Sequence, residues 1–398
     1  MEDDTKFSYC IIHGVKVNID SIKKMHPGGS IAISLAENRD ISVLFDQYHF
    51  GTPVMDRVKE KPAKNTFYED LYTQANLFFG CKENFKMSTS MVVFNSIVGL
   101  AAGACWLGWM QGSFLACLLL PFFQWLIFVN VGHEAGHFAM SKNPGANHLA
   151  CLFSHLLFVN TTHWYLQHAV SHHSNTNEAH KDFDLTHFVP YLRMHPGQKW
   201  NSNLKYQLFL GSATTWLTST FAESIIYPIK MLLSKSKGEL QMKNSQALLN
   251  LTKYSCIAQI FASLGILVYP FSFLHVNKAA FFALYPYIIG SILFMTFTQI
   301  THINEKAQKN DKWNHWSEQM VDTSMDYEQT SFFWTYVSGG LNMQGLHHCL
   351  PSLSSSRYRK FYPIYRDVCK KHKIKINETD SLLTALYMYW DHMKNLTE

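Results

Sequence analysis

The residues of this chain best suited to chemistry are three histidine clusters with helical spacing. They read His133-Glu-Ala-Gly-His137, His168-Ala-Val-Ser-His172-His173 and Gln344-Gly-Leu-His347-His348. Neutral imidazole is the commonest metal ligand in proteins and suits iron, zinc and copper. Because so many ligands exceed what one ion needs, the clusters predict a site for two metal ions.

The spacing of each cluster predicts that its ligands project together. Positions i and i+4 share a helix face, as do i and i+3. His133 and His137 therefore point the same way, and Gln344 shares a face with the two histidines that follow it. His302 comes directly after a long apolar run and is a further candidate ligand. We expect these faces to converge and enclose both ions.

The first cluster also satisfies H-E-x-x-H, which on a helix can be a zinc protease site with Glu134 as general base. Such a site needs only one further protein ligand and leaves the other two clusters unexplained. Zinc has no redox states. Two histidine-bound irons, in contrast, can reduce dioxygen and oxidise an unactivated C–H bond. The surplus of histidines favours the redox interpretation.

Apolar runs long enough to cross a bilayer stand before these clusters. A crossing takes about 20 residues. The chain is 15% aromatic and only 16% charged. The runs are Met91–Met110, Ser113–Val131, Ser255–Leu274 and Ala279–Ile300. They predict a mainly α, polytopic membrane protein with four transmembrane helices and a helical cap that holds the metals.

Counting the crossings predicts which side the clusters face. Two runs precede the first cluster and two separate the second from the third, so all clusters and the N-terminus share one side. Lysines and arginines are frequent in the long loop on that side, whereas the connectors opposite carry only Lys278. The positive-inside rule makes the cluster side cytosolic. We interpret Leu208–Ile229, apolar but containing Glu223, as an interfacial or half-buried helix.

Charge and cysteine content narrow the class of protein further. The net charge of +5 is modest, and no lysine- or arginine-rich patch suggests a nucleic-acid partner. Eight scattered cysteines without a CxxC predict a reducing compartment and no disulfide framework. The first residues lack a basic-then-apolar signal peptide, so membrane insertion must rest on the internal runs.

The N-terminal region contains Lys24-Met-His26-Pro27-Gly28-Gly29, followed by Phe45 and His49. This segment resembles a cytochrome b5 domain, a small α+β haem-binding unit. The resemblance implies that His26 and His49 are the axial ligands of haem b. Two histidine ligands leave no open position for dioxygen, so the haem would transfer electrons. The plainer alternative is a turn histidine beside a Pro-Gly-Gly bend. We expect a haem domain over residues 1–75, with the charged stretch Lys59–Lys64 as a linker.

The order of haem domain, two spans, two histidine clusters, two spans and a third cluster resembles the cytochrome b5-fusion, or front-end, fatty acid desaturases. These belong to the membrane histidine-box di-iron family. Gln344, in place of the first histidine of HxxHH, is the most specific element of the resemblance. Two positions depart from the commoner pattern. Three residues separate His168 and His172, where two are usual, and Glu134 stands where aspartate is frequent.

The resemblance implies an oxygen-dependent acyl-lipid or acyl-CoA desaturase over residues 76–398. It would insert a cis double bond between an existing double bond of a polyunsaturated acyl chain and its carboxyl end. Electrons would come from NADH through cytochrome b5 reductase and the haem, in the endoplasmic reticulum membrane. The implied iron ligands are His133, His137, His168, His172, His173, His302, Gln344, His347 and His348. A sphingolipid long-chain-base desaturase, an acyl hydroxylase and an acetylenase share this layout and stay open as alternatives.

Overall fold

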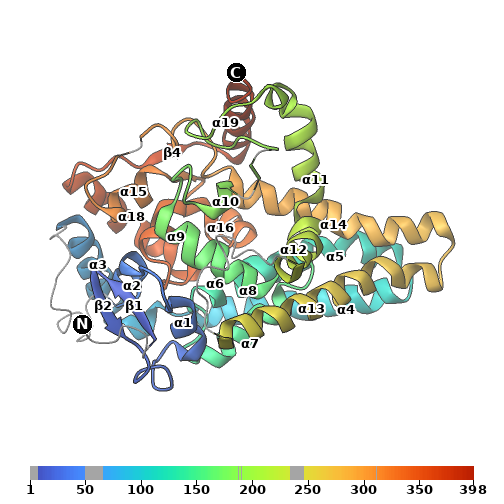
Figure 1. Ribbon diagram of the computed structural model, residues 1–398, viewed down its shortest axis with the longest axis horizontal. Helices are drawn as coiled ribbons and strands as arrows, with labels where there is room; N and C mark the ends of the chain where they lie inside the picture. The colour runs from blue at the N-terminus through green and yellow to red at the C-terminus, as the bar shows by residue number, and fades with distance from the viewer. Residues whose placement is uncertain (1–7, 50–65, 187, 190, 234–245, 311) are drawn as a thin grey trace.

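The computed structural model describes residues 8–49, 66–186, 188–189, 191–233, 246–310 and 312–398. The protein is mainly helical: a bundle of long helices projects from a larger cap, which also contains the C-terminus (Figure 1). The predicted linker at Lys59–Lys64 lies outside the described residues.

Four helices of the described part are long and apolar enough to cross a membrane, as predicted. The first is α4 (Thr89–Met110), and the fourth is α14 (Val276–Gln299). The second begins as α5 (Phe114–Ile127) and continues through the π-helix η3 (Phe128–His133) into α6 (Glu134–Gly136). The third joins α13 (Gln246–Val268) to the 3-10 turn η9 (Tyr269–Ser272). The observed ends differ from the predicted ends by a few residues.

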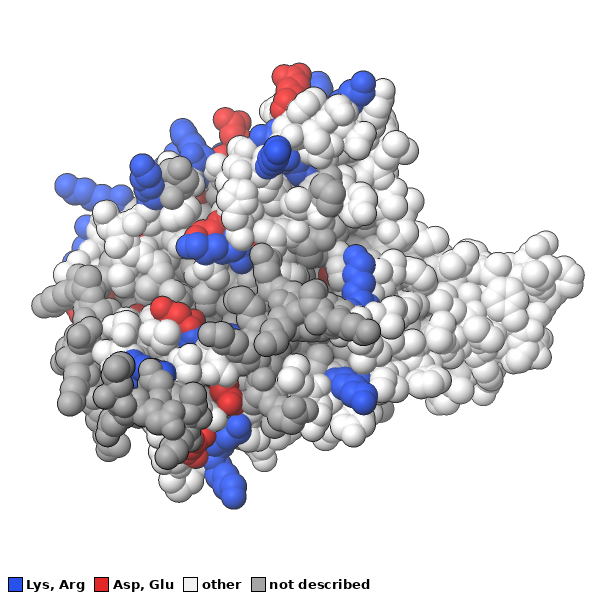
Figure 2. Space-filling view, viewed as in Figure 1, with Lys and Arg blue, Asp and Glu red and all other residues white. Residues whose placement is uncertain are grey.

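The surface of the bundle is suited to lipid. Large apolar side chains face outward along it, among them Leu100 on α4, Leu115 on α5 and Phe261 on α13. Figure 2 shows Lys, Arg, Asp and Glu gathered over the cap, while the visible face of the projecting bundle carries none. An exposed apolar surface of this extent marks a membrane interaction site.

The segment that includes Leu208–Ile229 is not among the candidate spans of the described residues. It consists of η6 (Leu208–Ser212), α11 (Ala213–Phe221), η7 (Ala222–Ile226) and α12 (Tyr227–Leu233). Helix α11 packs against α14 and runs steeply across it (Figure 1). Two spans, α13 and α14, therefore separate the second histidine cluster from the third. All three clusters lie at the cap end of the bundle.

The cap is built from short helices and two small strands. Some of them precede the third span in the sequence, and the others follow the fourth span. Between the second and third spans lie α7 (Pro144–Ser154), α8 (Thr161–Trp164), the π-helix η4 (Tyr165–His172), α9 (His173–Asn175), α10 (Phe183–Thr186) and η5 (Ser202–Tyr206). After the fourth span come α15 (Trp316–Asp322), β3 (Met325–Tyr327), α16 (Phe332–Ser338), η10 (Leu341–Met343), α17 (Gln344–Cys349), α18 (Ser355–Lys371), β4 (Asn377–Thr379) and α19 (Leu382–Asn395). Strands β3 and β4 pair in parallel, with Met325 opposite Asn377.

The N-terminal segment forms a small unit against this cap. Strands β1 (Tyr9–Ile12) and β2 (Val15–Asn18) pair antiparallel and are followed by α1 (Gly29–Ala36) and α2 (Ser42–His49). Their buried apolar side chains form a core of their own, made of Cys10, Ile12, Ile19, Ile33, Ala36 and Phe45.

Helix α3 (Thr66–Phe79) belongs to a different core. Its buried residues share an apolar cluster with α15, α17 and α18. The connecting turn η2 (Lys82–Phe85) adds Phe85 to the same cluster. The separate small core is therefore formed by residues that precede α3.

Candidate metal centre

Four imidazoles from all three clusters form the first potential metal group: His133, His137, His168 and His347. One ring nitrogen from each lies within 4.8 Å of the others. The ring centroids of His133 and His347 are 4.7 Å apart, although 214 positions separate them in the numbering (347 − 133). The end of the second span, η4 and α17 therefore bring their ligands to one point.

The second potential metal group consists of His172, His302 and His348, again with ring nitrogens within 4.8 Å. The Nε2 atoms of His302 and His348 are 3.1 Å apart. The side-chain amide of Gln344 reaches the same point, with its nitrogen 2.8 Å from His302 Nε2. An amide can present either nitrogen or oxygen in this position, and only the oxygen can bind a metal. The structure thus brings together His302 and Gln344, which the sequence singled out.

His173 lies between the two groups. Its ring centroid is 4.3 Å from that of His137 and 4.2 Å from that of His348. It also forms a third possible group with His347 and His348. The nine predicted ligands therefore make one continuous cluster in which two ions could share neighbouring positions.

The unusual spacing of the second cluster has a local explanation. His168 and His172 lie in η4, a π-helix, and His173 follows it directly. The i→i+5 hydrogen bonds of a π-helix make a wider turn than those of an α-helix. Positions i, i+4 and i+5 then face one side, as i, i+3 and i+4 do in an α-helix. The extra residue is absorbed by the wider turn, and all three histidines keep their place in the cluster.

The inward-facing nitrogens fit a bound metal. Among the described residues, the Nε2 atoms of His133, His137, His168, His173 and His347 are buried without a hydrogen-bond partner, as is the Gln344 oxygen. Buried polar atoms without partners are rare and costly, so their concentration here calls for a ligand. Burial and the neighbouring histidines hold the pKa of His137, His173 and His348 well below the usual range. These rings are therefore neutral, which is the form that binds metals.

The outward-facing nitrogens are held by other side chains and carbonyls. Metal-binding histidines commonly use their second nitrogen in this way, which fixes the orientation of the ring. The partners of Nδ1 are Tyr48 for His137 (3.2 Å), Asp182 for His172 (2.9 Å), the Thr323 carbonyl for His302 (2.9 Å), Tyr358 for His347 (3.1 Å) and Thr176 for His348 (3.2 Å). None of these partners was recognised from the sequence.

Asp182 and Asp184 bring negative charge to the second cluster. Asp182 accepts from His172, while Asp184 lies 3.5 Å from the Nδ1 atoms of both His168 and His172. Burial lowers the pKa of His172, but the two carboxylates outweigh it and raise the pKa to about 9. A metal cation on the opposite ring nitrogen would satisfy the same carboxylates in place of a proton.

Glu134 points away from the histidines. Its carboxylate accepts the Ser355 backbone N–H at 2.5 Å and the Ser354 hydroxyl at 2.7 Å, so it joins the second span to the start of α18. A general base must reach the proton that it removes, either directly or through one water. Glu134 instead holds the fold together, which excludes its role in the zinc-protease interpretation.

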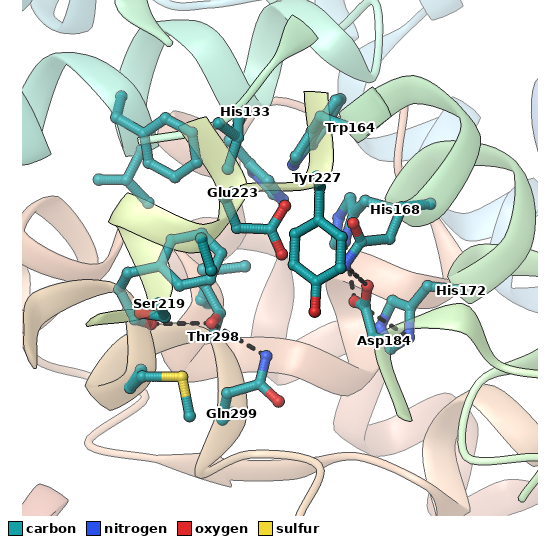
Figure 3. A pocket seen from close by; sticks show the side chains of 18 of the residues that line it. His133, Trp164, His168, His172, Asp184, Ser219, Glu223, Tyr227, Thr298 and Gln299 are labelled. Carbon is teal, nitrogen blue, oxygen red and sulfur yellow. Dashed lines mark hydrogen bonds and ion pairs between the residues drawn. The ribbon is translucent and has the colours of Figure 1, made fainter. Parts of the chain in front are cut away.

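A narrow cavity adjoins the histidines at the inner end of the bundle. His133, His168, His172 and Gln344 contribute to its wall. Its apolar side includes Phe128, Val129, Val159, Phe294, Met295 and Leu341. Figure 3 shows Glu223, Tyr227, Thr298 and Gln299 around the same space. Glu223, which lies in η7, is buried with its carboxylate 3.2 Å from His163 Nδ1. The cavity is thus lined by both apolar and polar side chains beside one potential metal centre.

His26 and His49 meet in the N-terminal unit. Their Nε2 atoms face each other at 3.4 Å. His49 Nδ1 lies 3.1 Å from the Phe45 carbonyl, and His26 Nδ1 accepts the Gly28 N–H at 3.1 Å. Two imidazole–metal bonds of roughly 2 Å each need about 4 Å between the nitrogens. The two rings would therefore have to move apart only slightly to admit a metal between them. The facing pair fits the axial ligation that the resemblance implied.

Comparison with known proteins agrees with this geometry. Residues 104–380 match the fatty acid desaturase family, and the match covers more than half of the chain. The chain therefore belongs to the fatty acid desaturase family, whose enzymes are oxidoreductases.

Similar proteins extend over almost the whole length of the chain. It is 31% identical to the acyl-lipid omega-13 desaturase of Chlamydomonas reinhardtii, over 98% of this chain and 92% of that protein. It is 22% identical to the acyl-lipid (8-3)-desaturase of Mortierella alpina, over 98% and 93%. Identity to the probable Delta(5) fatty acid desaturase C of Dictyostelium discoideum is 24%, over 97% and 91%.

Proposed function

We propose that this desaturase is a di-iron enzyme that inserts a cis double bond near the carboxyl end of a polyunsaturated acyl chain. The observation that carries the proposal is the convergence of three histidine clusters and His302 on one buried point. The inward Nε2 atoms of His133, His137, His168, His173 and His347 have no partner among the described residues, and a cavity with apolar side chains opens beside them.

The proposed iron ligands follow the two main groups. One ion would be held by His133, His137, His168 and His347, and the other by His172, His302, His348 and the Gln344 oxygen. His173 lies where it could serve either ion. Bound iron would supply the redox chemistry with dioxygen that removes two hydrogens from adjacent methylenes. The two hydrogens removed from the acyl chain supply two electrons and two protons, and two external electrons with two protons from solvent complete the reduction of dioxygen to two waters.

The protein's own contribution to the reaction is to place the acyl chain and exclude water. The apolar wall formed by Phe128, Val129, Phe294 and Met295 would hold methylenes against the histidine cluster. Holding reactants in one geometry supplies a large share of many enzymatic rate accelerations. Because the cavity lies at the end of the bundle, an acyl chain would have access to it from the bilayer. Burial of the cavity would shield the reaction from solvent.

The polar side chains that line this cavity support a reaction near the carboxyl end. A double bond inserted there brings the polar head of the substrate close to the metals. A double bond far from the head would instead need apolar side chains around the acyl chain on both sides of the reacting carbons. Ser219, Glu223, Tyr227, Thr298 and Gln299 line the same cavity as His133 and His168. Among them the buried Ser219 hydroxyl has no partner in the described part of the chain, and burying a polar group in this way costs free energy. We infer that they face the head-group end of the substrate.

An acyl-lipid is the proposed substrate carrier. Two of the similar proteins carry the term acyl-lipid in their names, in an alga and a fungus. These names favour a fatty acyl group on a complex lipid over coenzyme A. They also favour an acyl substrate over a sphingoid base.

The proposed electron supply is haem b bound between His26 and His49 in the N-terminal unit. The facing Nε2 atoms support it. Bis-histidine haem is suited to electron transfer because no axial position remains for dioxygen. NADH-cytochrome b5 reductase is the proposed partner that reloads the haem.

The proposed location is the endoplasmic reticulum membrane, with the cap in the cytosol. The three histidine clusters lie at one end of the four candidate spans, which supports a single orientation for the proposed metal site. Positive side chains lie on the cap (Figure 2), which the positive-inside rule assigns to the cytosol.

The function is tested by expressing the full chain in yeast and supplying single polyunsaturated acids of two chain lengths. Mass spectrometry of lipid classes then locates the new double bond. A bond at a fixed distance from the carboxyl end in both acids, found first in phospholipids, is expected. His347→Ala is the inactive control. A bond at a fixed distance from the methyl end, a hydroxylated product, or products confined to sphingoid bases would contradict the proposal.

A further inference from the structure

Helix α2 connects the N-terminal unit directly to the metal-site histidines. It ends at His49, and the three preceding residues all contact parts of the chain outside the N-terminal unit. Asp46 accepts the Trp316 indole N–H at 3.2 Å. The Gln47 amide donates to the His348 carbonyl at 3.0 Å, and the Tyr48 hydroxyl lies 3.2 Å from His137 Nδ1.

These contacts are buried rather than superficial. Gln47 is 0% exposed and also reaches the His173 carbonyl at 3.5 Å. A buried side-chain amide that binds the backbone of two metal-site residues fixes the position of α2 on the cap. Removing it would leave buried carbonyls without a donor, which costs the desolvation of those groups.

Tyr48 is placed to orient a metal ligand. His137 Nε2 points into the cluster, so a metal bound there would leave the hydrogen on Nδ1. Nδ1–H would then donate to the Tyr48 oxygen at 3.2 Å. Outer partners of this kind fix the ring and tune the metal that it binds.

We propose that Tyr48 is a positioning residue for the electron transfer of the proposed function: it holds the His137 ring and joins α2, the helix that ends at His49, to the metal site. One peptide bond separates the proposed haem ligand from the residue that holds a proposed iron ligand. Each transfer oxidises the haem site by one electron and reduces the histidine-bound site by one. Two transfers supply the external electrons of one turnover, and NADH replaces them through the reductase. The inference rests on the proposed haem and iron sites.

The test uses purified full-length protein in lipid nanodiscs. The haem is reduced with NADH and reductase, mixed with acyl-lipid and oxygen, and its reoxidation is followed by absorbance. The rate is divided by bound non-haem iron. Tyr48→Phe removes only the hydroxyl, and Tyr9→Phe on β1 is the matched control. We expect Tyr48→Phe to slow the rate on the order of ten- to a hundred-fold, as for other outer partners of metal ligands. Its haem spectrum and midpoint potential should not change.

Wild-type and variant results separate the two proposals. A wild-type chain without a haem spectrum or non-haem iron contradicts the proposed function. A normal wild type with a Tyr48→Phe rate within two-fold of it overturns the role of Tyr48. A wild-type rate that rises with protein concentration overturns transfer within one chain. If Tyr48→Phe fails to fold, Gln47→Leu decides: slow reoxidation with intact haem supports the inference, and a normal rate overturns it.

Discussion

Replacing Asp182 with asparagine should weaken metal binding at the second group of ligands. Asp182 is 0% exposed, and its carboxylate accepts from His172 Nδ1 at 2.9 Å. The same carboxylate accepts the backbone N–H groups of Asn177 at 2.8 Å and Asp184 at 2.9 Å. Asparagine keeps one acceptor oxygen for these three donors and removes the negative charge beside the ring.

The expected size follows from the two roles of Asp182. Loss of a carboxylate behind a metal-bound histidine typically weakens metal binding ten- to a hundred-fold, or roughly 1.4–2.7 kcal/mol. Unpaired N–H groups in the loop cost on the order of 1–3 kcal/mol more, and this second cost appears with or without metal. Only the first cost depends on iron.

Chelator competition with the iron-loaded protein measures the first cost, and thermal unfolding of the metal-free protein measures the second. Asp184→Asn is the matched comparison. Its carboxylate lies farther from His172, at 3.5 Å, and is 16% exposed, so its effect should be smaller. The reasoning is refuted if folded Asp182→Asn holds iron as tightly as the wild type, or if Asp184→Asn has the larger effect.

Three further outcomes are expected. Gln344→Ala should lower iron content and abolish desaturation, since it removes the amide beside His302; normal iron and activity would show that Gln344 only packs its helix. Deleting Val170 leaves two residues between His168 and His172, a spacing that an α-helical turn accommodates, so iron binding should persist. Inserting an alanine at the same point should release iron. Iron kept by the insertion and lost by the deletion would contradict the π-helix explanation. Asn395-Leu-Thr matches the sequence pattern for N-glycosylation. It should stay unmodified in microsomes, and a glycan there would place the C-terminus in the lumen.

Much of the metal centre could be predicted because its ligands follow local patterns. Histidines at i and i+4 share a helix face wherever the helix lies, and apolar runs must cross the bilayer or be buried. His302 was found by its depth after the fourth span, a position comparable to that of His137 after the second. These signals come from neighbouring residues in the sequence.

The partners behind the ligands could not be predicted, because they are distant in sequence. Tyr48 is 89 positions from His137, and Glu134 reaches Ser354 across 220 positions. Tyrosine, serine and aspartate are common residues with many possible surroundings, so no spacing distinguishes these. The H-E-x-x-H pattern also suggested a role for Glu134 that only its contact with α18 excludes.

The π-helical turns also could not be predicted from neighbouring residues in the sequence. Composition does not distinguish an α-helix from a π-helix, and Tyr165–His172 reads as an ordinary amphipathic helix. The tertiary requirement that His168, His172 and His173 all reach the cluster selects the wider turn. π-Bulges occur mostly at functional sites for this kind of reason.

The most direct test of the di-iron proposal is a count of non-haem iron per chain. His49→Ala should lose the haem, so the iron that remains reports the histidine clusters alone. Metal analysis of this variant, purified after expression with ample iron, should give about two irons per chain, with little zinc, because the two groups of ligands each hold one ion. One ion per chain in this variant, or zinc in place of iron in an active wild-type preparation, would contradict the two-iron centre.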